Sequence, residues 1–177
     1  MRAAYEARTG AFGPEDAWFE VRSRAFWDDA LTTQGFARVA EAHLSDAARS
    51  LVPRLAVAHR GFFVVREDRI VDLWSGTELV VGRLDESQAI SLAHAEGAFD
   101  GRVIAAADAG PLYVLPGAYH HHPDALEPAL KVLAASRERK LATPVVLDAL
   151  MRMDLVLRKS SRVKAAFAYR VESLPST

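Results

Sequence analysis

The sequence contains no cysteine among its 177 residues. Disulfides, thiolate metal sites, iron–sulfur clusters and a cysteine nucleophile are therefore excluded. The net charge is only −1, so overall charge indicates neither a nucleic acid nor a membrane as the partner. The longest uncharged stretch, residues 110–122, contains two prolines and falls short of the roughly 20 apolar residues of a membrane span. We therefore expect a cytoplasmic protein with no membrane segment.

The chain also lacks the common catalytic and cofactor motifs. It has no G-x-S-x-G, no H-E-x-x-H, no phosphate-binding P-loop and no G-x-G-x-x-G. The first 13 residues have no apolar core of the kind that a secretory signal carries. Half of the residues are hydrophobic and a quarter are charged, which is typical of a globular domain. Arginine outnumbers lysine 18 to 4, which we interpret as the codon bias of a GC-rich bacterial genome.

Residue patterning predicts one domain, residues 1–177, made of three blocks. Residues 13–60 repeat apolar side chains at helical spacing. Residues 62–116 are rich in β-branched and aromatic residues separated by turn signals, and they predict about five short strands. Residues 123–170 are again helical, and they are basic. The expected fold is α+β: N-terminal helices, a small antiparallel sheet or partial barrel, and then C-terminal helices.

The clearest helical period of the chain follows Thr143 and Pro144, which suit a cap and a first helical position. Its apolar positions are Val146, Leu150, Met153 and Leu157. The spacing predicts that Asp148 and Asp154 form i, i+4 pairs with arginines on the outer surface. Residues 162–171 alternate like a strand but contain alanines and basic residues that favour a helix, so both readings stay open. A short helix is also expected to begin at Asp85 and to end at Gly97.

The run His120 to His122 is the most conspicuous local feature. Neutral imidazoles bind zinc, copper or nickel, but adjacent histidines on one backbone seldom converge on one ion. We interpret the run as a polar loop before Pro123, and we expect no tightly bound metal and no cofactor. His59 and His94 are potential general bases, but no nucleophile pattern accompanies them, so a structural role is the simpler interpretation.

Carboxylates occur next to each other at 28–29 and at 85–86, where we expect solvated helix surface and a helix start. The segment from Asp100 to Arg102 places opposite charges around a glycine, and a tight turn with a local ion pair explains it.

The strongest overall signal is an asymmetry of charge along the chain. Residues 1–130 carry 12 basic and 19 acidic side chains, whereas residues 131–170 carry 10 basic and 3 acidic ones. The candidate partner-binding residues are Arg158, Lys159, Arg162, Lys164 and Trp74. The basic residues could meet an acidic surface within the fold, in a second copy or on a partner. Trp74 precedes a glycine turn and is either a binding platform or a core anchor.

These observations favour a non-enzymatic bacterial interaction, adaptor or regulatory module of the cytoplasm, which binds a protein partner or associates with itself. One alternative is a nucleic-acid-binding protein that uses the basic C-terminal helices. A third hypothesis is a metal-dependent or hydrolytic enzyme organised around His120 to His122.

Overall fold

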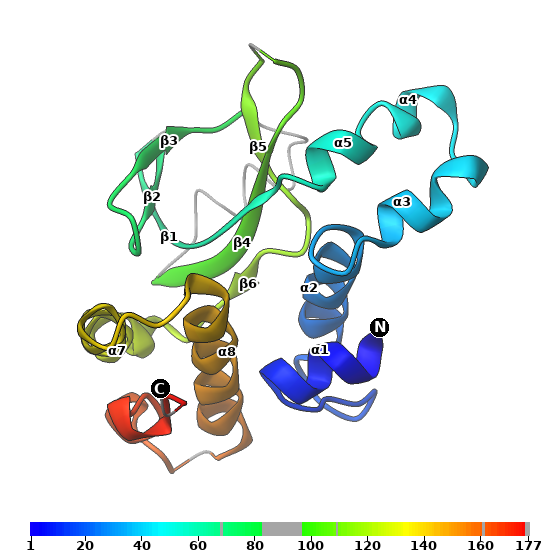
Figure 1. The fold of residues 1–177 in the computed structure, drawn as a ribbon. Helices are drawn as coiled ribbons and strands as arrows, with labels where there is room; N and C mark the ends of the chain where they lie inside the picture. Colours follow the sequence, from blue (N-terminus) through cyan, green and yellow to red (C-terminus); the bar gives the residue numbers. More distant parts are fainter. Residues whose placement is uncertain (68, 83–96, 109, 161, 176–177) are drawn as a thin grey trace.

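An antiparallel sheet packs with helices from both ends of the chain, so the predicted α+β class is confirmed (Figure 1). The computed structural model describes residues 1–67, 69–82, 97–108, 110–160 and 162–175. The N-terminal elements are α1 (Arg2–Thr9), α2 (Phe19–Leu31), α3 (Phe36–Ala40), the 3-10 turn η1 (Glu41–His43), α4 (Asp46–Arg49) and α5 (Val52–Leu55). The short elements from α3 to α5 form an arm that leaves α2 and returns to the sheet (Figure 1).

The sheet has six strands among the described residues, in the order β3-β2-β1-β4-β5, with β6 paired to β4. They are β1 (His59–Arg66), β2 (Arg69–Asp72), β3 (Glu78–Val80), β4 (Ala98–Ala105), β5 (Leu112–Val114) and β6 (Tyr119–His120). All strand pairs are antiparallel. A single bridge from Val81 to Leu112 joins the two edges, but the described strands do not close into a barrel.

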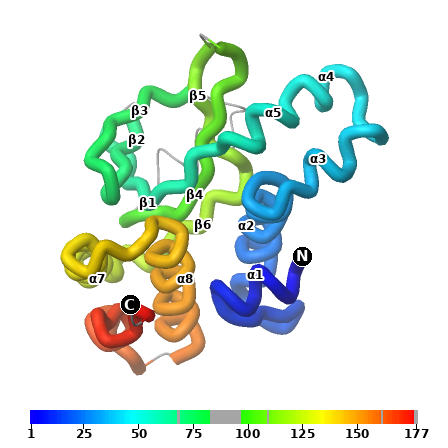
Figure 2. The backbone as a smooth tube through the Cα atoms, viewed as in Figure 1, coloured from blue at the N-terminus to red at the C-terminus, as the bar shows by residue number. Residues whose placement is uncertain are grey.

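The C-terminal elements cover one face of this sheet. They are η2 (Pro123–Ala125), α7 (Leu126–Glu138), α8 (Thr143–Lys159), α9 (Ala165–Ala168) and η3 (Val171–Ser173). The backbone view shows α1 beside α8, and the chain after α8 folding back next to α7 and α8 (Figure 2).

Alternation along β1 divides the core between the two faces of the sheet. Phe62 packs with α7, α8 and α9, whereas Phe63 packs with β2, β4 and β5 on the opposite face. A third apolar cluster joins the N-terminal helices to α8 through Tyr5, Phe12 and Met151. Helix α8 is therefore buried on two sides, against the sheet and against α1.

The predicted helix from Thr143 to Lys159 matches α8, and its apolar stripe packs in the main core. Helix α1 was not predicted, and His120, the first residue of the supposed polar loop of histidines, belongs to strand β6. For residues 162–171 both a strand and a helix were open. The structure has the one-turn helix α9 and part of η3 there and no strand, and Ala165, Ala168 and Tyr169 all pack into the core. The helix expected from Asp85 lies outside the described residues.

The position of α8 gives a stability prediction. Leu150 is fully buried, so Leu150→Ala should lower the free energy of unfolding by about 2–5 kcal/mol through lost contacts and a residual cavity. Val156 lies on the same helix with 53% of its surface exposed, and Val156→Ala should change stability by less than about 0.5 kcal/mol. Urea unfolding of both variants measures the difference. Equal midpoints for Leu150→Ala and wild type would contradict the packing of α8.

Candidate functional site

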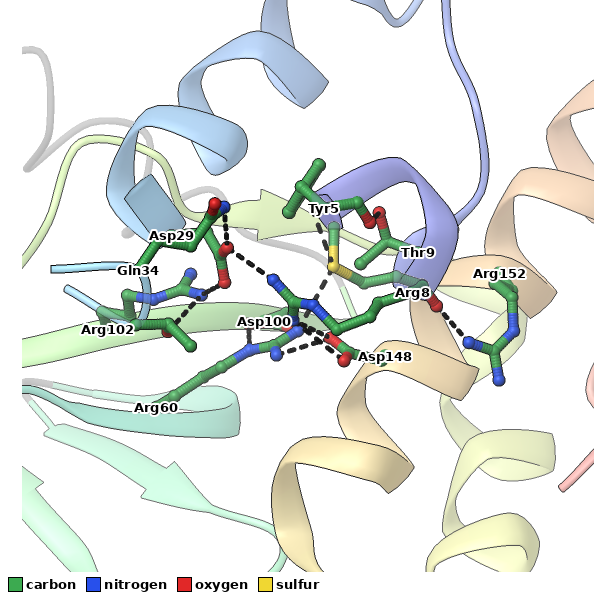
Figure 3. Close-up of polar contacts among 12 residues, drawn as sticks. Tyr5, Arg8, Thr9, Asp29, Gln34, Arg60, Asp100, Arg102, Asp148 and Arg152 are labelled. Atoms are coloured by element: carbon green, nitrogen blue, oxygen red, sulfur yellow. Dashed lines mark hydrogen bonds and ion pairs between the residues drawn. The ribbon is translucent and has the colours of Figure 1, made fainter. Parts of the chain in front are cut away.

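Two arginines face each other across the central strand pair. Arg60 of β1 and Arg102 of β4 are directly opposite in the register, an arrangement that repels unless carboxylates compensate it. The Arg60 guanidinium binds Asp100 at 2.6 and 3.0 Å, and it binds Asp148 of α8 at 2.7 Å (Figure 3). Arg102 binds Asp29 of α2 at 2.7 Å. Burial and the neighbouring charge of Arg60 lower the pKa of Arg102.

Arg8 of α1 closes this set of charges. Its guanidinium reaches Asp29 at 2.6 Å and Asp148 at 3.0 Å, so it links the carboxylates that hold the two strand arginines (Figure 3). We call this set the arginine–aspartate network; its members are Arg8, Arg60, Arg102, Asp29, Asp100 and Asp148. Its three positive and three negative charges balance, and only Arg8 is substantially exposed. We therefore assign it a structural role.

The network corrects several expectations for charged residues. Asp28 and Asp29 are buried rather than solvated on a helix surface. Asp100 lies within β4 and binds Arg60, so the predicted turn with a local ion pair to Arg102 is absent among these described residues. Asp148 is also buried, and it binds arginines from α1 and β1 instead of its i+4 neighbour. For Asp29, Asp100 and Asp148, arginines distant in sequence compensate the buried charge.

Asp28 is held apart from this network by a backbone contact. Its carboxylate accepts a hydrogen bond of 2.8 Å from the amide of Gly117. A Cβ atom at position 117 would lie 2.4 Å from the carbonyl oxygen of Arg24, so only glycine allows this approach. Burial raises the pKa of Asp28 to about 6, although the charge of Arg102 and the Gly117 amide act to lower it. This carboxyl group therefore keeps its proton to a higher pH than an exposed aspartate does.

The balance of charges predicts a large effect at Arg60. Arg60→Met leaves Asp100 and part of Asp148 buried without their cation, so stability should fall by about 3–5 kcal/mol. Arg69→Met is the matched control, since Arg69 pairs with Glu78 on the exposed surface and should contribute about 1 kcal/mol or less. Chemical unfolding of both variants tests this. A loss at Arg60 no greater than at Arg69 would argue against the network as a determinant of the fold.

Asp28 gives a prediction of pH dependence. Its pKa is higher in the folded protein than in the unfolded chain, so the folded state retains the proton between about pH 4 and 6 while the unfolded state loses it. Raising the pH through this window therefore destabilises the protein, by roughly 2–3 kcal/mol from this group. The stability of wild type relative to Asp28→Asn should therefore fall as the pH rises through this window. Unfolding curves recorded across this range measure this trend. A constant difference in unfolding free energy between wild type and Asp28→Asn would refute the raised pKa of Asp28.

The three adjacent histidines lie in three different environments. His120 is half-buried and stacks near Phe99 at 5.3 Å between ring centroids. His121 is buried between Phe62 and Tyr119, and the exposed His122 lies 3.8 Å from Asp124. Within the described ranges, no three histidine or acidic side chains are close enough to hold a metal ion. His59 binds Asp72 at 3.1 Å, and His94 lies outside the described residues.

Asp154 is the centre of a buried polar cluster. It accepts hydrogen bonds from the hydroxyls of Tyr119 at 2.6 Å and Tyr169 at 3.0 Å, and it pairs with Arg158 at 2.5 Å. Burial acts to raise the pKa of Asp154, but the charge of Arg158 and the hydrogen bonds from Tyr119 and Arg158 hold it below its usual value. The predicted Asp154–Arg158 pair therefore exists, although Asp154 is buried rather than on the outer surface.

The same cluster fixes the state of His121. Because Tyr169 donates its hydroxyl proton to Asp154, the 2.6 Å contact requires His121 to donate from Nδ1. Burial lowers the pKa of His121, so the ring is neutral and Nε2 carries no proton. Nε2 has no hydrogen-bond partner among the described residues.

Beside this cluster lies a pocket of about 670 Å³, which we call the C-terminal groove. It is bounded by η2, the start of α7, the end of α8 and the chain leading into α9. Its lining residues are His122, Asp124, Glu127, Pro128, Leu157, Arg158, Ser160, Arg162, Val163, Lys164, Ala165 and Ala166. The groove thus combines cationic, acidic and apolar side chains.

The structure brings three of the five candidate residues, Arg158, Arg162 and Lys164, to this groove. Lys159 is not in its lining; the ammonium group lies 3.4 Å from the carbonyl oxygen of Ala11. Trp74 is also elsewhere, partly buried against the main core under the guanidinium of Arg137 at 5.3 Å. The acidic lining residues of the groove were not predicted as site residues, although Asp124 and Glu127 show the spacing of a helix-capping box in the sequence.

Basic side chains of residues 131–170 bind mainly backbone oxygens rather than the acidic N-terminal part. Arg137 donates to the carbonyls of Leu73 and Trp74, and Arg152 donates to that of Arg8. Of the three carboxylates in this stretch, Asp148 and Asp154 are buried, which leaves Glu138 as the exposed one. The surface of this block is therefore more basic than its composition suggests.

No protein-family model matches the chain, and no curated protein or solved structure matches it either. No helix in the described part is long and apolar enough to cross a membrane. The functional argument therefore rests on the geometry of the groove.

Proposed function

We propose that the protein is a cytoplasmic bacterial interaction module that binds a segment of a partner protein in the C-terminal groove. The observation that carries this proposal is the mixed lining of the groove. Arg162 and Lys164 are exposed there and form no ion pair within the described part of the chain, while Asp124 presents an exposed carboxylate to the same space. A peptide that carries an acidic and a basic side chain complements both groups.

The acidic residues of the lining favour a protein over a nucleic acid. A continuous polyanion would be attracted by Arg162 and Lys164 but would meet Asp124 and Glu127 in the same groove. The apolar part of the lining, which includes Leu157 and Val163, offers surface for an aliphatic side chain. The volume of about 670 Å³ lies within the range of roughly 300–1,000 Å³ typical of ligand pockets.

The test is direct binding to probes of defined charge. Short synthetic peptides that are acidic, basic, mixed or neutral are compared with duplex DNA, single-stranded DNA and RNA at about 50 and 200 mM salt. We expect mixed-charge peptides to bind best. The double variant Arg162→Gln/Lys164→Gln should weaken their binding by about tenfold, because it removes both unpaired cations.

Arg49→Gln is the matched control, since Arg49 is an exposed cation on α4 that does not line the groove. It should leave peptide affinity unchanged. Failure of every peptide class to bind would refute the proposal. Tighter binding of a nucleic acid, with a steep salt dependence that the double variant abolishes, would replace it with the nucleic-acid alternative.

A further inference from the structure

We infer that Arg158 is the specificity-determining residue of the C-terminal groove and that it binds one carboxylate side chain of the bound segment. This inference rests on the proposed function and names the group that the groove recognises. It also assigns Asp154 as the positioning residue that holds Arg158 in its binding orientation.

Arg158 is fixed in place before any ligand arrives. Its Nε donates to Asp154 at 2.5 Å, and Nη2 donates to the carbonyl oxygen of His120 at 2.7 Å. The guanidinium also lies 5.5 Å from the centroid of the Tyr119 ring. Two bonds in different directions and one ring contact define a single orientation for this planar group.

The fixed guanidinium still has donors to offer. Arginine carries five N–H groups, and the two hydrogen bonds described above use one on Nε and one on Nη2. Three N–H groups remain beyond these two bonds, and 28% of the Arg158 side chain is exposed. Since Arg158 lines the groove, these donors are available to an acceptor that enters it. A carboxylate, with two oxygens, matches this fork.

Arg158 is not the only hydrogen-bond partner of Asp154. Its two oxygens also accept hydrogen bonds from Tyr119, from Tyr169 and from the backbone amide of His122 at 3.0 Å. Its negative charge is thus shared among four donors, and His121 beside it is uncharged. Asp154 therefore fixes the direction of Arg158 while leaving the guanidinium able to attract an anion.

Arg158 differs in this respect from the other two cations of the groove. Arg162 and Lys164 are exposed, and their side chains form no hydrogen bond or ion pair within the described ranges. Ordering such side chains on binding costs rotamer entropy, so they contribute long-range attraction more than geometric selection. Arg158 has already lost its rotamer freedom in the folded protein. The contact between its guanidinium and the ligand is therefore the one that depends on the shape of the ligand group.

The acidic lining residues favour a carboxylate over a phosphate as the bound group. A phosphate monoester carries close to two negative charges at neutral pH, and it would lie in the same groove as Asp124 and Glu127. A single carboxylate meets less repulsion, and a basic residue next to it in the segment can pair with one of these acidic side chains. We therefore expect a segment in which an aspartate or glutamate is accompanied by a basic residue.

The experiment combines substitutions in the protein and in the peptide. The probe is the tightest mixed-charge peptide of the binding test, together with analogues in which its acidic residue is replaced by glutamine or by phosphoserine. The protein variants are Arg158→Lys and, as the matched control, Arg162→Lys, both of which conserve charge. We expect Arg158→Lys to weaken binding of the acidic peptide by about tenfold and Arg162→Lys by less than about threefold.

The effect of Arg158→Lys should also depend on the acidic residue of the peptide. Replacing the acidic residue with glutamine should weaken binding to wild type but have little further effect on Arg158→Lys, because the contact is already lost. Asp154→Asn should lower affinity for the acidic peptide and leave the glutamine analogue unaffected, an outcome that a general loss of stability would not give. If Asp154→Asn does not fold, the double-mutant cycle of Arg158→Lys and the glutamine analogue tests the role of Arg158 by itself.

The outcomes separate this inference from the proposed function. Peptide binding that depends on Arg162 and Lys164 but is equal in Arg158→Lys and wild type would overturn the inference and leave the groove as a binding site. Tighter binding of the phosphoserine analogue would overturn the carboxylate assignment. Failure of all peptides to bind would overturn both proposals.

Discussion

Two arginines placed opposite each other on neighbouring strands are the constraint on which the rest of the structure depends. Arg60 and Arg102 share one face of the β1–β4 pair, and their repulsion must be compensated in a buried environment. The compensating carboxylates come from β4 itself, from α2 and from α8, and Arg8 of α1 links the last two. Charge balance therefore fixes where three helices meet the sheet, in addition to the apolar contacts that hold them there.

Helix α8 connects this network with the groove. Asp148 and Asp154 are six residues apart, which at 100° per residue places them about 120° apart around the helix axis. Asp148 therefore faces α1 and β1, whereas Asp154 faces β6 and α9. The apolar stripe lies outside this sector, on the remaining side of the helix, and packs in the main core. One helix thus supports the core on one side, the charge network on a second and the Arg158 anchor on a third.

Local pattern was sufficient for the elements whose apolar residues recur at a regular period. The α8 stripe was predicted for this reason. The strands around Phe62, Ile70 and Phe99 were predicted from their β-branched and aromatic residues and from the turn signals between them. Buried charge was not predictable in the same way. Arg60 and Asp148 are 88 positions apart, and nothing near either residue marks it as buried. A charged residue at a helical position predicts exposure to solvent unless its partner is known. The aspartates of α2 and α8 were therefore placed on the surface.

Predicting the groove requires both the local sequence pattern and the contacts between residues distant in sequence. The excess of basic residues in 131–170 was visible in the sequence, and it pointed to Arg158, Arg162 and Lys164. The buried cluster that distinguishes Arg158 from the other two was not visible, because Asp154 and Tyr169 come together only when α9 folds back against α8. A basic stretch of sequence attracts anions in general. Selection of one anionic group requires a cation of fixed direction, and in this protein that direction comes from a carboxylate and a backbone carbonyl that the fold brings to the same side chain.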